Sequence, residues 1–271
     1  MSKRYLVKIR YQWQLFCLAL MFFSQLPVSK SLPYSEKRMN RANRYFSLVG
    51  IVIGLLVCLS YSLFDHFFST HLVIILTMIT SVYITGAFHE DGLADMADGM
   101  GGGYSAEKRL TIMKDSRIGT YGTVTLVLSL LLKFQLLVEL EQHSILMISV
   151  VFAYAMSRAF AASLIFDTPY VAEDDSSKSK PIACQQSGID LMILLAVAFL
   201  PALLFPWFFV GFWSLLLSII VILLLLRLAF RYWLISKIAG YTGDCLGAAQ
   251  QVSELIIYLV LIHHISNTGV F

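Results

Sequence analysis

The sequence predicts an all-α protein, a polytopic membrane bundle of about six to eight helices. Of its 271 residues, 58% are apolar and only 14% are charged. Several uninterrupted apolar runs approach the length of about 20 residues that a helix needs to cross a bilayer. No internal repeat or separable soluble segment breaks this pattern. Residues 1–271 are therefore expected to form a single integral-membrane domain.

Six of the apolar runs are long enough to be predicted as membrane spans. They cover residues 44–64, 71–88, 120–138, 144–166, 189–205 and 212–232. Two shorter runs, at residues 12–28 and 251–266, leave open whether they cross the membrane completely. The sequence thus predicts six spans and one or two further helices.

The N-terminus is the segment whose membrane placement is least obvious. Four basic residues between positions 3 and 10 precede the first apolar run, as in a signal peptide, but no small-x-small cleavage site follows. The segment is therefore expected to be retained. A full span at 12–28 would leave these basic residues outside, so about the first 30 residues are expected to form an interfacial or re-entrant helix.

The distribution of Lys and Arg over the connecting segments predicts the orientation. Segments 30–44, 89–119, 167–188 and 233–250 hold 5, 4, 2 and 1 of these residues, whereas segments 65–70, 139–143 and 206–211 hold none. The first set is expected to face the cytoplasm. Nearly all of the candidate functional residues lie on that side, so the active site is expected at the cytoplasmic face. No nucleic-acid partner is expected.

An acidic motif stands directly behind the second predicted span. Glu90, Asp91, Asp95 and Asp98 place four acids within nine positions. The three aspartates are at i, i+4 and i+7, so in a helix they share one face, where they repel unless a cation or proton intervenes. A solvated helix end is the simpler interpretation. Beside a bilayer, however, carboxylates without a partner are costly. Oxygen ligands without Cys suit a hard ion, so these four acids are expected to form a metal site for Mg2+ or Mn2+.

A glycine-rich break and a charged tract follow the acids. The candidate substrate-binding residues there are Gly101, Gly102, Gly103, Lys114, Asp115, Ser116 and Arg117. Glycines let a phosphate approach the backbone, a helix N-terminus offers free N–H groups, and cations offset phosphoryl charge. The alternative is a flexible loop with positive-inside anchors, which is the better interpretation of Lys108 and Arg109.

Three charged residues farther along the chain complete the set of candidates. Arg158 lies within the 144–166 span and is expected to face inward, as a structural partner or as a substrate ligand. Asp244 and Glu254 stand among glycines at the entry to the last apolar helix. They are predicted as catalytic residues that complete the metal site, although a capped helix start would also explain them.

These motifs together resemble a known family. The segment FHEDGLADMADGMGGG at 88–103, followed by IMKDSRIGTYG at 112–122, closely resembles the cobalamin synthase family, the adenosylcobinamide-GDP ribazoletransferases. The resemblance extends to LPV at 26–28, to Gly50-x-x-x-Gly54 and to the TGDCLGA segment at 242–248 with Glu254. It covers most of the chain. One departure is Glu90, where a commoner member of the family has Leu.

The resemblance implies the last assembly step of the coenzyme B12 nucleotide loop, catalysed with Mg2+ in the bacterial inner membrane. Alpha-ribazole, or its 5'-phosphate, would react with adenosylcobinamide-GDP to give adenosylcobalamin, or its 5'-phosphate, and GMP. A ribose 5'-hydroxyl is expected to attack phosphorus, with Asp91, Asp95 and Asp98 as catalytic metal ligands and with Lys114 and Arg117 on phosphate oxygens. A homo-oligomer, or association with other nucleotide-loop enzymes, is compatible with this expectation.

Three other classes compete with this interpretation. A CDP-alcohol phosphotransferase shares Asp95-x-x-Asp98-Gly99, but Gly102 and Gly103 stand where an Ala-Arg pair would be expected, and the later aspartates at that family's spacing are missing. An intramembrane prenyltransferase would need a second acidic motif at another spacing. A divalent-cation or corrinoid transporter would place its acids near the midplane and would show symmetric broken helices.

Overall fold

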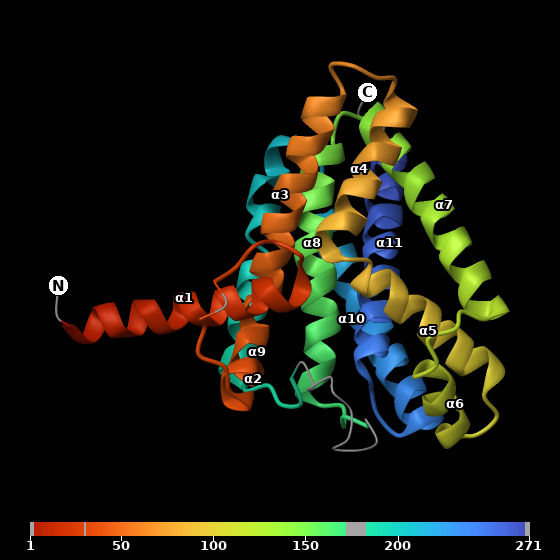
Figure 1. The fold of residues 1–271 in the computed structure, drawn as a ribbon. Helices are drawn as coiled ribbons and strands as arrows, with labels where there is room; N and C mark the ends of the chain where they lie inside the picture. The colour runs from red at the N-terminus through yellow and green to blue at the C-terminus, as the bar shows by residue number, and fades with distance from the viewer. Residues whose placement is uncertain (1–2, 30, 172–182, 269–271) are drawn as a thin grey trace.

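The computed structural model describes residues 3–29, 31–171 and 183–268, and it is helical throughout, apart from one isolated bridge (Figure 1). Seven helices run along the bundle: α3 (Phe46–Phe64), α4 (Thr70–Thr85), α7 (Thr120–Gln142), α8 (Leu146–Ser163), α9 (Gly188–Ala198), α10 (Phe212–Ile238) and α11 (Gly243–Thr268). Four helices lie at its lower end in Figure 1: α1 (Lys3–Phe23), α2 (Glu36–Ala42), α5 (Phe88–Gly102) and α6 (Ala106–Met113). The all-α prediction is confirmed.

The described residues contain 6 helices long and apolar enough to cross a membrane, and a seventh crossing if α4 and α5 form one broken span. The run at 251–266 belongs to one of the six, α11. The run predicted at 189–205 is divided into α9 and a 3-10 helix, Pro201–Trp207. The chain is therefore a multi-pass membrane protein by helix length and composition.

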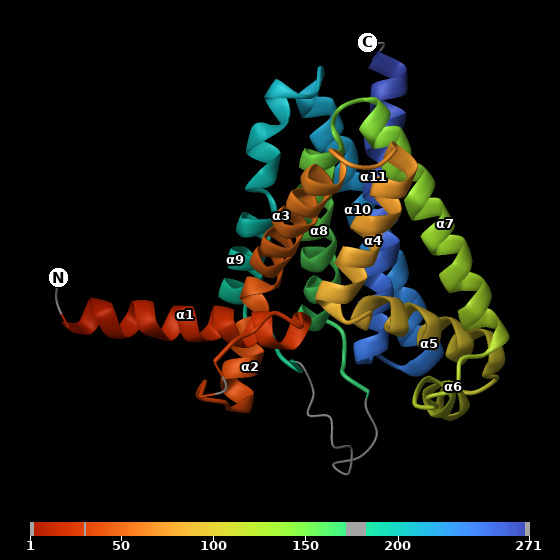
Figure 2. The same ribbon diagram turned by 45° about the horizontal axis from the view of Figure 1, so that its top comes forward.

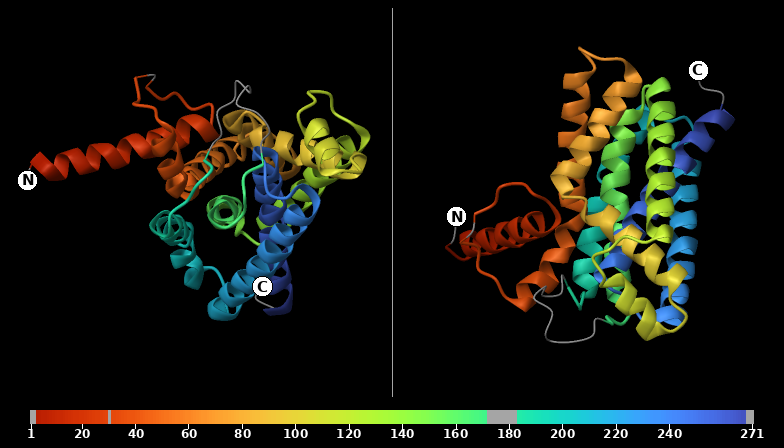
Figure 3. Two further views of the ribbon diagram at one scale, coloured as in Figure 1. Left: turned by 90° about the horizontal axis from the view of Figure 1, so that it is seen from below. Right: turned by 45° about the vertical axis from the view of Figure 1, so that its right-hand side comes forward.

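Helix α8 forms the centre of the bundle, and Figure 3 shows it surrounded by the other helices when the molecule is viewed from below. Nearly all of its side chains are buried, and many of them are alanines. Helix α3 approaches it through Gly50 and Gly54, where an added Cβ would meet the α8 backbone at Tyr154 and Val151. Small residues at such crossings let membrane helices pack closely without a hydrophobic driving force.

The predicted 71–88 span ends earlier than expected, because the chain turns sharply after Thr85. Gly86 and Ala87 both have positive φ, at 67° and 58°, and α5 leaves α4 at 86°. Figures 1 and 2 show α5 running across the lower end of the bundle. Helix α4 passes the criteria of length and hydropathy for a span only together with α5, and α5, with its four acids, does not pass them alone. The turn thus carries the acidic motif across the bundle rather than along it.

Helix α1 lies nearly perpendicular to the bundle (Figures 1 and 3) and does not have the properties of a membrane span. Its C-terminal half is anchored by buried Leu15 and Leu18, and Phe23 stacks on Phe46 with ring centroids 3.7 Å apart. An interfacial or re-entrant placement of about the first 30 residues stays a prediction.

We predict that Gly86→Ala destabilises the turn between α4 and α5. A side chain in the left-handed region costs about 1 kcal/mol, and the new Cβ would lie 2.6 Å from the Gln25 amide nitrogen. The midpoint of thermal unfolding in detergent should therefore fall. Gly188→Ala is the matched control, because its Cβ meets nothing within 4 Å. Equal midpoints for the two variants would contradict this account.

Candidate active site

The site begins at the crossing of α5 and α11, where two glycines face each other. A Cβ on Gly92 would lie 3.0 Å from the Cα of Asp244 and 3.2 Å from the Cα of Gly247. A Cβ on Gly247 would lie 3.2 Å from the carbonyl oxygen of His89. Only glycine permits so close an approach of two backbones. The contact brings the acidic motif of α5 to the first turn of α11.

The first turn of α11 is held by the segment that follows α8. The Tyr241 N–H donates to the Pro169 carbonyl at 2.8 Å, and the Val171 N–H donates to the Tyr241 carbonyl at 3.0 Å. The Thr242 hydroxyl then accepts from the Cys245 N–H at 3.4 Å and so caps the helix start. These bonds fix the position of Asp244, whose backbone contacts Gly92.

Carboxylates from both helices gather at this crossing. Burial and the negative charges of Asp91, Asp244 and Asp98 raise the pKa of Asp95 to about 7. Desolvation acts first, and repulsion between like charges adds to it. Asp91 is exposed and Asp95 is half-buried, so the cluster opens to solvent. The structure thus brings together Asp91, Asp95 and Asp244, as the sequence predicts, with Asp98 at the edge.

Asp98 also has a structural partner that its spacing does not reveal. Its two oxygens accept the backbone N–H groups of Gly119, at 2.6 Å, and of Gly122, at 2.8 Å. The carboxylate therefore caps the N-terminus of α7, where free N–H groups and the helix dipole favour negative charge. Each oxygen retains a lone pair. Asp98 thus joins α5 to α7 while its side chain remains a candidate ligand.

Glu90 and Glu254 do not lie with the aspartates but in the interior. Glu254 Oε1 lies 2.7 Å from Lys133 Nζ, and both side chains are almost fully buried. Gln250 Nε2 donates to Glu254 Oε2 at 2.6 Å, and Gln251 Nε2 donates both to Gln250 Oε1 and to Glu90 Oε1, each at 3.0 Å. A continuous polar network therefore joins α7, α11 and α5.

Arg158 belongs to the same interior rather than to the acidic cluster. It is 2% exposed, and its Nη1 donates to the Tyr154 carbonyl at 3.1 Å. Its guanidinium lies 5.0 Å from the centroid of the Tyr154 ring. The Nε of Arg158 and one oxygen of Glu90 are buried without a direct partner among the described residues. Arg158 therefore faces inward, as predicted, but its geometry is that of a structural cation.

The tract between α6 and α7 borders the site at its open side. Arg117 is exposed and forms an ion pair with Asp115 at 2.6 Å, and Lys114 and Ser116 are exposed beside them. Of the three glycines, Gly101 packs on the Tyr121 ring and Gly103 on Arg109, whereas Gly102 meets only the end of Ile112. Their contact with substrate stays a prediction, although packing explains two of the glycines.

The donor set fits a hard divalent ion. Among the residues that the structure describes, no three His, Cys, Asp or Glu side chains form a ready-made metal cage. Mg2+ does not need such a cage, because it is usually held by one or two carboxylates together with substrate phosphates and water. Burial first, and then the charges of Asp91, Asp244 and Asp98, raise the pKa of Asp95, and a cation would relieve the part that comes from like charge. Asp91, Asp95 and Asp244 stay candidates for holding such an ion.

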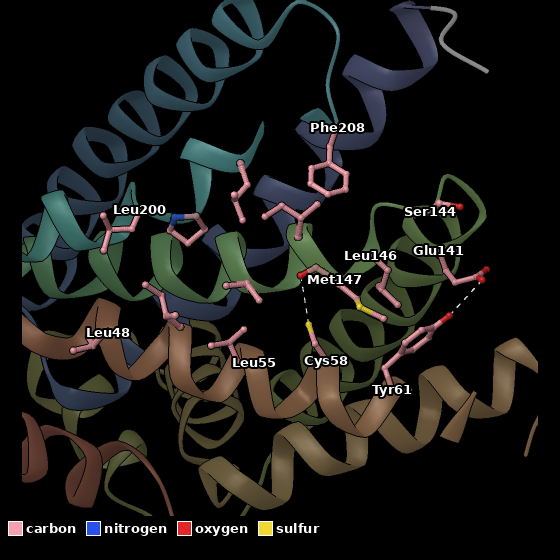
Figure 4. A pocket seen from close by; sticks show the side chains of 15 residues that line it. Leu48, Leu55, Cys58, Tyr61, Glu141, Ser144, Leu146, Met147, Leu200 and Phe208 are labelled. Carbon is pink, nitrogen blue, oxygen red and sulfur yellow. Dashed lines mark hydrogen bonds between the residues drawn. The ribbon is translucent and has the colours of Figure 1, made fainter. Parts of the chain in front are cut away.

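A second feature, shown in Figure 4, lies apart from these acids. It is an apolar groove of about 790 Å³ between α3, α8 and the 3-10 helix Pro201–Trp207. Tyr61 donates to Glu141 at 3.4 Å at one end of the groove, and Cys58 donates to the Met147 carbonyl. None of the predicted site residues lines the groove. It therefore offers no support for the predicted chemistry.

The polar network and the cap formed by Asp98 were not predicted from the sequence. The pair Gln250–Gln251 and the lone Lys133 inside a span were signals of the network, because polar side chains in a buried helix require partners. Nothing local indicated the partners of Asp98, which lie 21 and 24 positions away.

The fold and the site define a polytopic membrane protein with a cluster of carboxylates at one end of its bundle. The description "Cobalamin-5-phosphate synthase" belongs to the family profile that matches residues 15–262. The chain belongs to this family.

Curated relatives agree. The chain is 54% identical to an adenosylcobinamide-GDP ribazoletransferase of Vibrio cholerae, over 94% of this chain and 95% of the relative. It is 52% identical to the protein of that name from Vibrio parahaemolyticus, over 96% of each chain. With the protein of that name from Shewanella piezotolerans it shares 48% identity, over 93% of this chain and 96% of the relative. No solved structure matches.

We predict that Lys133→Met destabilises the protein by roughly 3–5 kcal/mol, because it leaves the buried charge of Glu254 uncompensated. The Tyr258 hydroxyl also donates to Glu254, at 3.3 Å. The double variant Lys133→Met/Glu254→Gln should recover most of the loss, since the neutral amide can still bond with Gln250 and Tyr258. Unfolding in mixed micelles measures both changes. Strictly additive effects of the two substitutions would show that the pair is not coupled.

We predict that Asp95→Asn stabilises the metal-free protein at pH 8. A carboxyl whose pKa is raised in the folded state weakens folding once pH exceeds the unfolded pKa, and the cost is complete above the folded pKa of about 7. The gain from Asn should therefore be largest at pH 8 and smaller at pH 5.5. Thermal unfolding in detergent with EDTA at both pH values measures it. A gain independent of pH would contradict the assignment of its cause to charge.

Proposed function

We propose that this protein is an adenosylcobinamide-GDP ribazoletransferase, which catalyses the final step of cobalamin synthesis. The observation that carries the conclusion is membership of the cobalamin-5-phosphate synthase family, with relatives of that name about half identical over nearly the whole chain. The site supports it, because its acids stand beside an exposed tract with Lys114 and Arg117. Carboxylates for a cation and cations for phosphates are what transfer from a diphosphate requires.

The reaction transfers the adenosylcobinamide-phosphate moiety to alpha-ribazole or its 5'-phosphate. A ribose oxygen forms a bond to the phosphorus on the cobinamide side, the bond from that phosphorus to the bridging oxygen breaks, and GMP leaves. A 5'-phosphate acceptor keeps its phosphate in the product. The 5'-hydroxyl therefore cannot be the common nucleophile, and we correct that expectation to a different ribose hydroxyl. The hydroxyl proton passes to a carboxylate or to solvent.

The candidate site residues have two proposed roles, to hold the metal ion and to bind phosphate. Asp91, Asp95 and Asp244 would hold Mg2+, which when bound supplies neutralisation of the diphosphate charge. Lys114 and Arg117 would bind phosphate oxygens. Alignment of the hydroxyl with the phosphorus accounts for the rest of the catalysis.

For the proton acceptor, the structure favours Asp244 over Glu254. Asp244 lies near Asp91 and Asp95, whereas Glu254 is buried and bonded to Lys133, Gln250 and Tyr258. A general base must come within hydrogen-bond reach of the proton that it accepts. Glu254, first expected to be catalytic, is better explained as a structural link between α11 and α7, and Glu90 as the residue that joins α5 to the same network.

The proposed location is the bacterial inner membrane, with the site at the cytoplasmic face. Of the connections rich in Lys and Arg, the described segments 31–44 and 89–119 lie at the lower end of the bundle in Figure 1. The positive-inside rule assigns that end to the cytoplasm. The same arrangement weighs against a transporter, because the acids gather at one end of the bundle. Lipid surrounds the spans, and association with other nucleotide-loop enzymes would occur on the same face.

We predict that Asp91→Asn, Asp95→Asn and Asp244→Asn each reduce GMP release by at least 100-fold, because each removes a ligand of the ion that neutralises the diphosphate. Purified protein in detergent, given adenosylcobinamide-GDP, alpha-ribazole and Mg2+, provides the assay, and EDTA should abolish the activity. Asp65→Asn, an acid at the opposite end of the bundle, is the matched control and should retain activity.

Detergent removes the two compartments, so turnover there also distinguishes an enzyme from a transporter. Normal turnover by Asp95→Asn would refute its proposed role in holding the metal. Uptake of corrinoid or metal only in sealed vesicles, without GMP release in detergent, would refute the enzyme itself.

A further inference from the structure

The N-terminal part of the chain carries a large share of its positive charge. Residues 3–44 contain nine of the 20 Lys and Arg residues, against a single acid, Glu36. Helices α1 and α2 account for most of this segment. Basic segments beside a membrane are attracted to anionic phospholipid headgroups. The charge of this segment therefore favours an anionic binding partner for α1 and α2.

The first half of α1 projects away from the bundle (Figures 1 and 3). All side chains from Tyr5 to Arg10 are exposed. Tyr5, Ile9 and Trp13 are spaced at i, i+4 and i+8 and so form a stripe along one face; they are 64%, 55% and 62% exposed. An apolar stripe of this length needs cover in an aqueous setting. The bundle does not supply it within the described residues.

The other face of α1 contacts α2 through polar groups. Arg38 Nη1 donates to Gln14 Oε1 at 3.0 Å, and its guanidinium lies 5.0 Å from the Tyr11 ring centroid. Arg41 Nη1 donates to the Tyr11 hydroxyl at 3.3 Å. These partners are neutral, so the contacts orient two cations without cancelling their charge.

The geometry of α1 places the stripe and the cations on different sides. Ile9 and Trp13 are each two positions from Tyr11, which is about 200° around a helix. The stripe therefore points away from α2. Because α2 lies below α1 in Figures 1 and 2, the stripe faces the side toward which α3 and α4 rise. This is the orientation of an amphipathic helix embedded in the surface of a bilayer.

We infer that α1 and α2 form a docking surface for anionic phospholipids. The stripe of Tyr5, Ile9 and Trp13 enters the acyl-chain boundary. Lys8, Arg10 and the basic residues of α2 gather the phosphate headgroups around it. Because α1 also packs through Leu15 and Leu18 on the bundle, the lipid surface holds the N-terminal helix in the plane from which the site opens.

The first test measures which lipids the full-length protein retains. Protein reconstituted with equal amounts of phosphatidylglycerol and phosphatidylcholine is re-extracted in mild detergent, and the bound lipids are counted by native mass spectrometry. Wild type should be enriched in phosphatidylglycerol. Lys8→Gln/Lys37→Gln should lower the enrichment by about fivefold for each cation removed. The matched control is Lys108→Gln/Lys237→Gln, which removes two exposed cations from α6 and α10 and should retain the enrichment.

The second test locates the stripe. A variant with Trp207, Trp213 and Trp233 replaced by Phe retains Trp13 as its only tryptophan. Brominated phosphatidylglycerol should quench its fluorescence more than brominated phosphatidylcholine does. Equal enrichment in both double variants, or a Trp13 that neither lipid quenches, would overturn the proposal. So would a dimer that shields Trp13 and dissociates in Ile9→Ser, because the stripe would then bind a second copy of the chain.

Discussion

The structure depends on one constraint, that α5 lies across the end of the bundle in close contact with α11. Two interactions impose it. Gly92 and Gly247 let the two backbones touch, and the network from Lys133 through Glu254, Gln250 and Gln251 ties α11 and α7 to Glu90. Asp98 adds a tie at the surface by capping α7. The helices that carry the acids are therefore held by buried contacts and by a contact at the surface. These contacts keep the acids close despite their repulsion.

The buried charges around Glu254 and the aspartates near the surface differ in how far their charge is compensated. In the interior, Glu90 and Glu254 accompany Lys133 and Arg158, so the charges of these four side chains are balanced where water cannot screen them. At the surface, partial burial and the neighbouring carboxylates together raise the pKa of Asp95 to about 7. An enzyme that handles a diphosphate benefits from this imbalance, because a cation and its phosphate ligands relieve it only when they bind. The same crowding of carboxylates that would bind a cation lowers the stability of the fold at the site.

The sequence predicted the parts of this structure that depend on local patterns. Apolar runs located the spans, and the i, i+4, i+7 spacing identified α5 and its aspartates before any contact was known. The 86° turn was missed because Gly86 and Ala87 continue an apolar run, and a sharp turn there depends on the left-handed conformation of two residues. The ion pair of Lys133 with Glu254 was missed because the partners are 121 positions apart, and only the packing of α7 on α11 brings them together. Glu254 was assigned to catalysis for lack of that information.

The central claim is that acids from distant parts of the chain form one site for a divalent ion. Titration of the purified protein with Mn2+, followed by electron paramagnetic resonance in the presence of adenosylcobinamide-GDP, tests it most directly. The account predicts one class of bound Mn2+, weakened at least tenfold in Asp95→Asn on α5 and equally in Asp244→Asn on α11. Unchanged Mn2+ affinity in Asp244→Asn would contradict the account, because α11 would then have no part in the site.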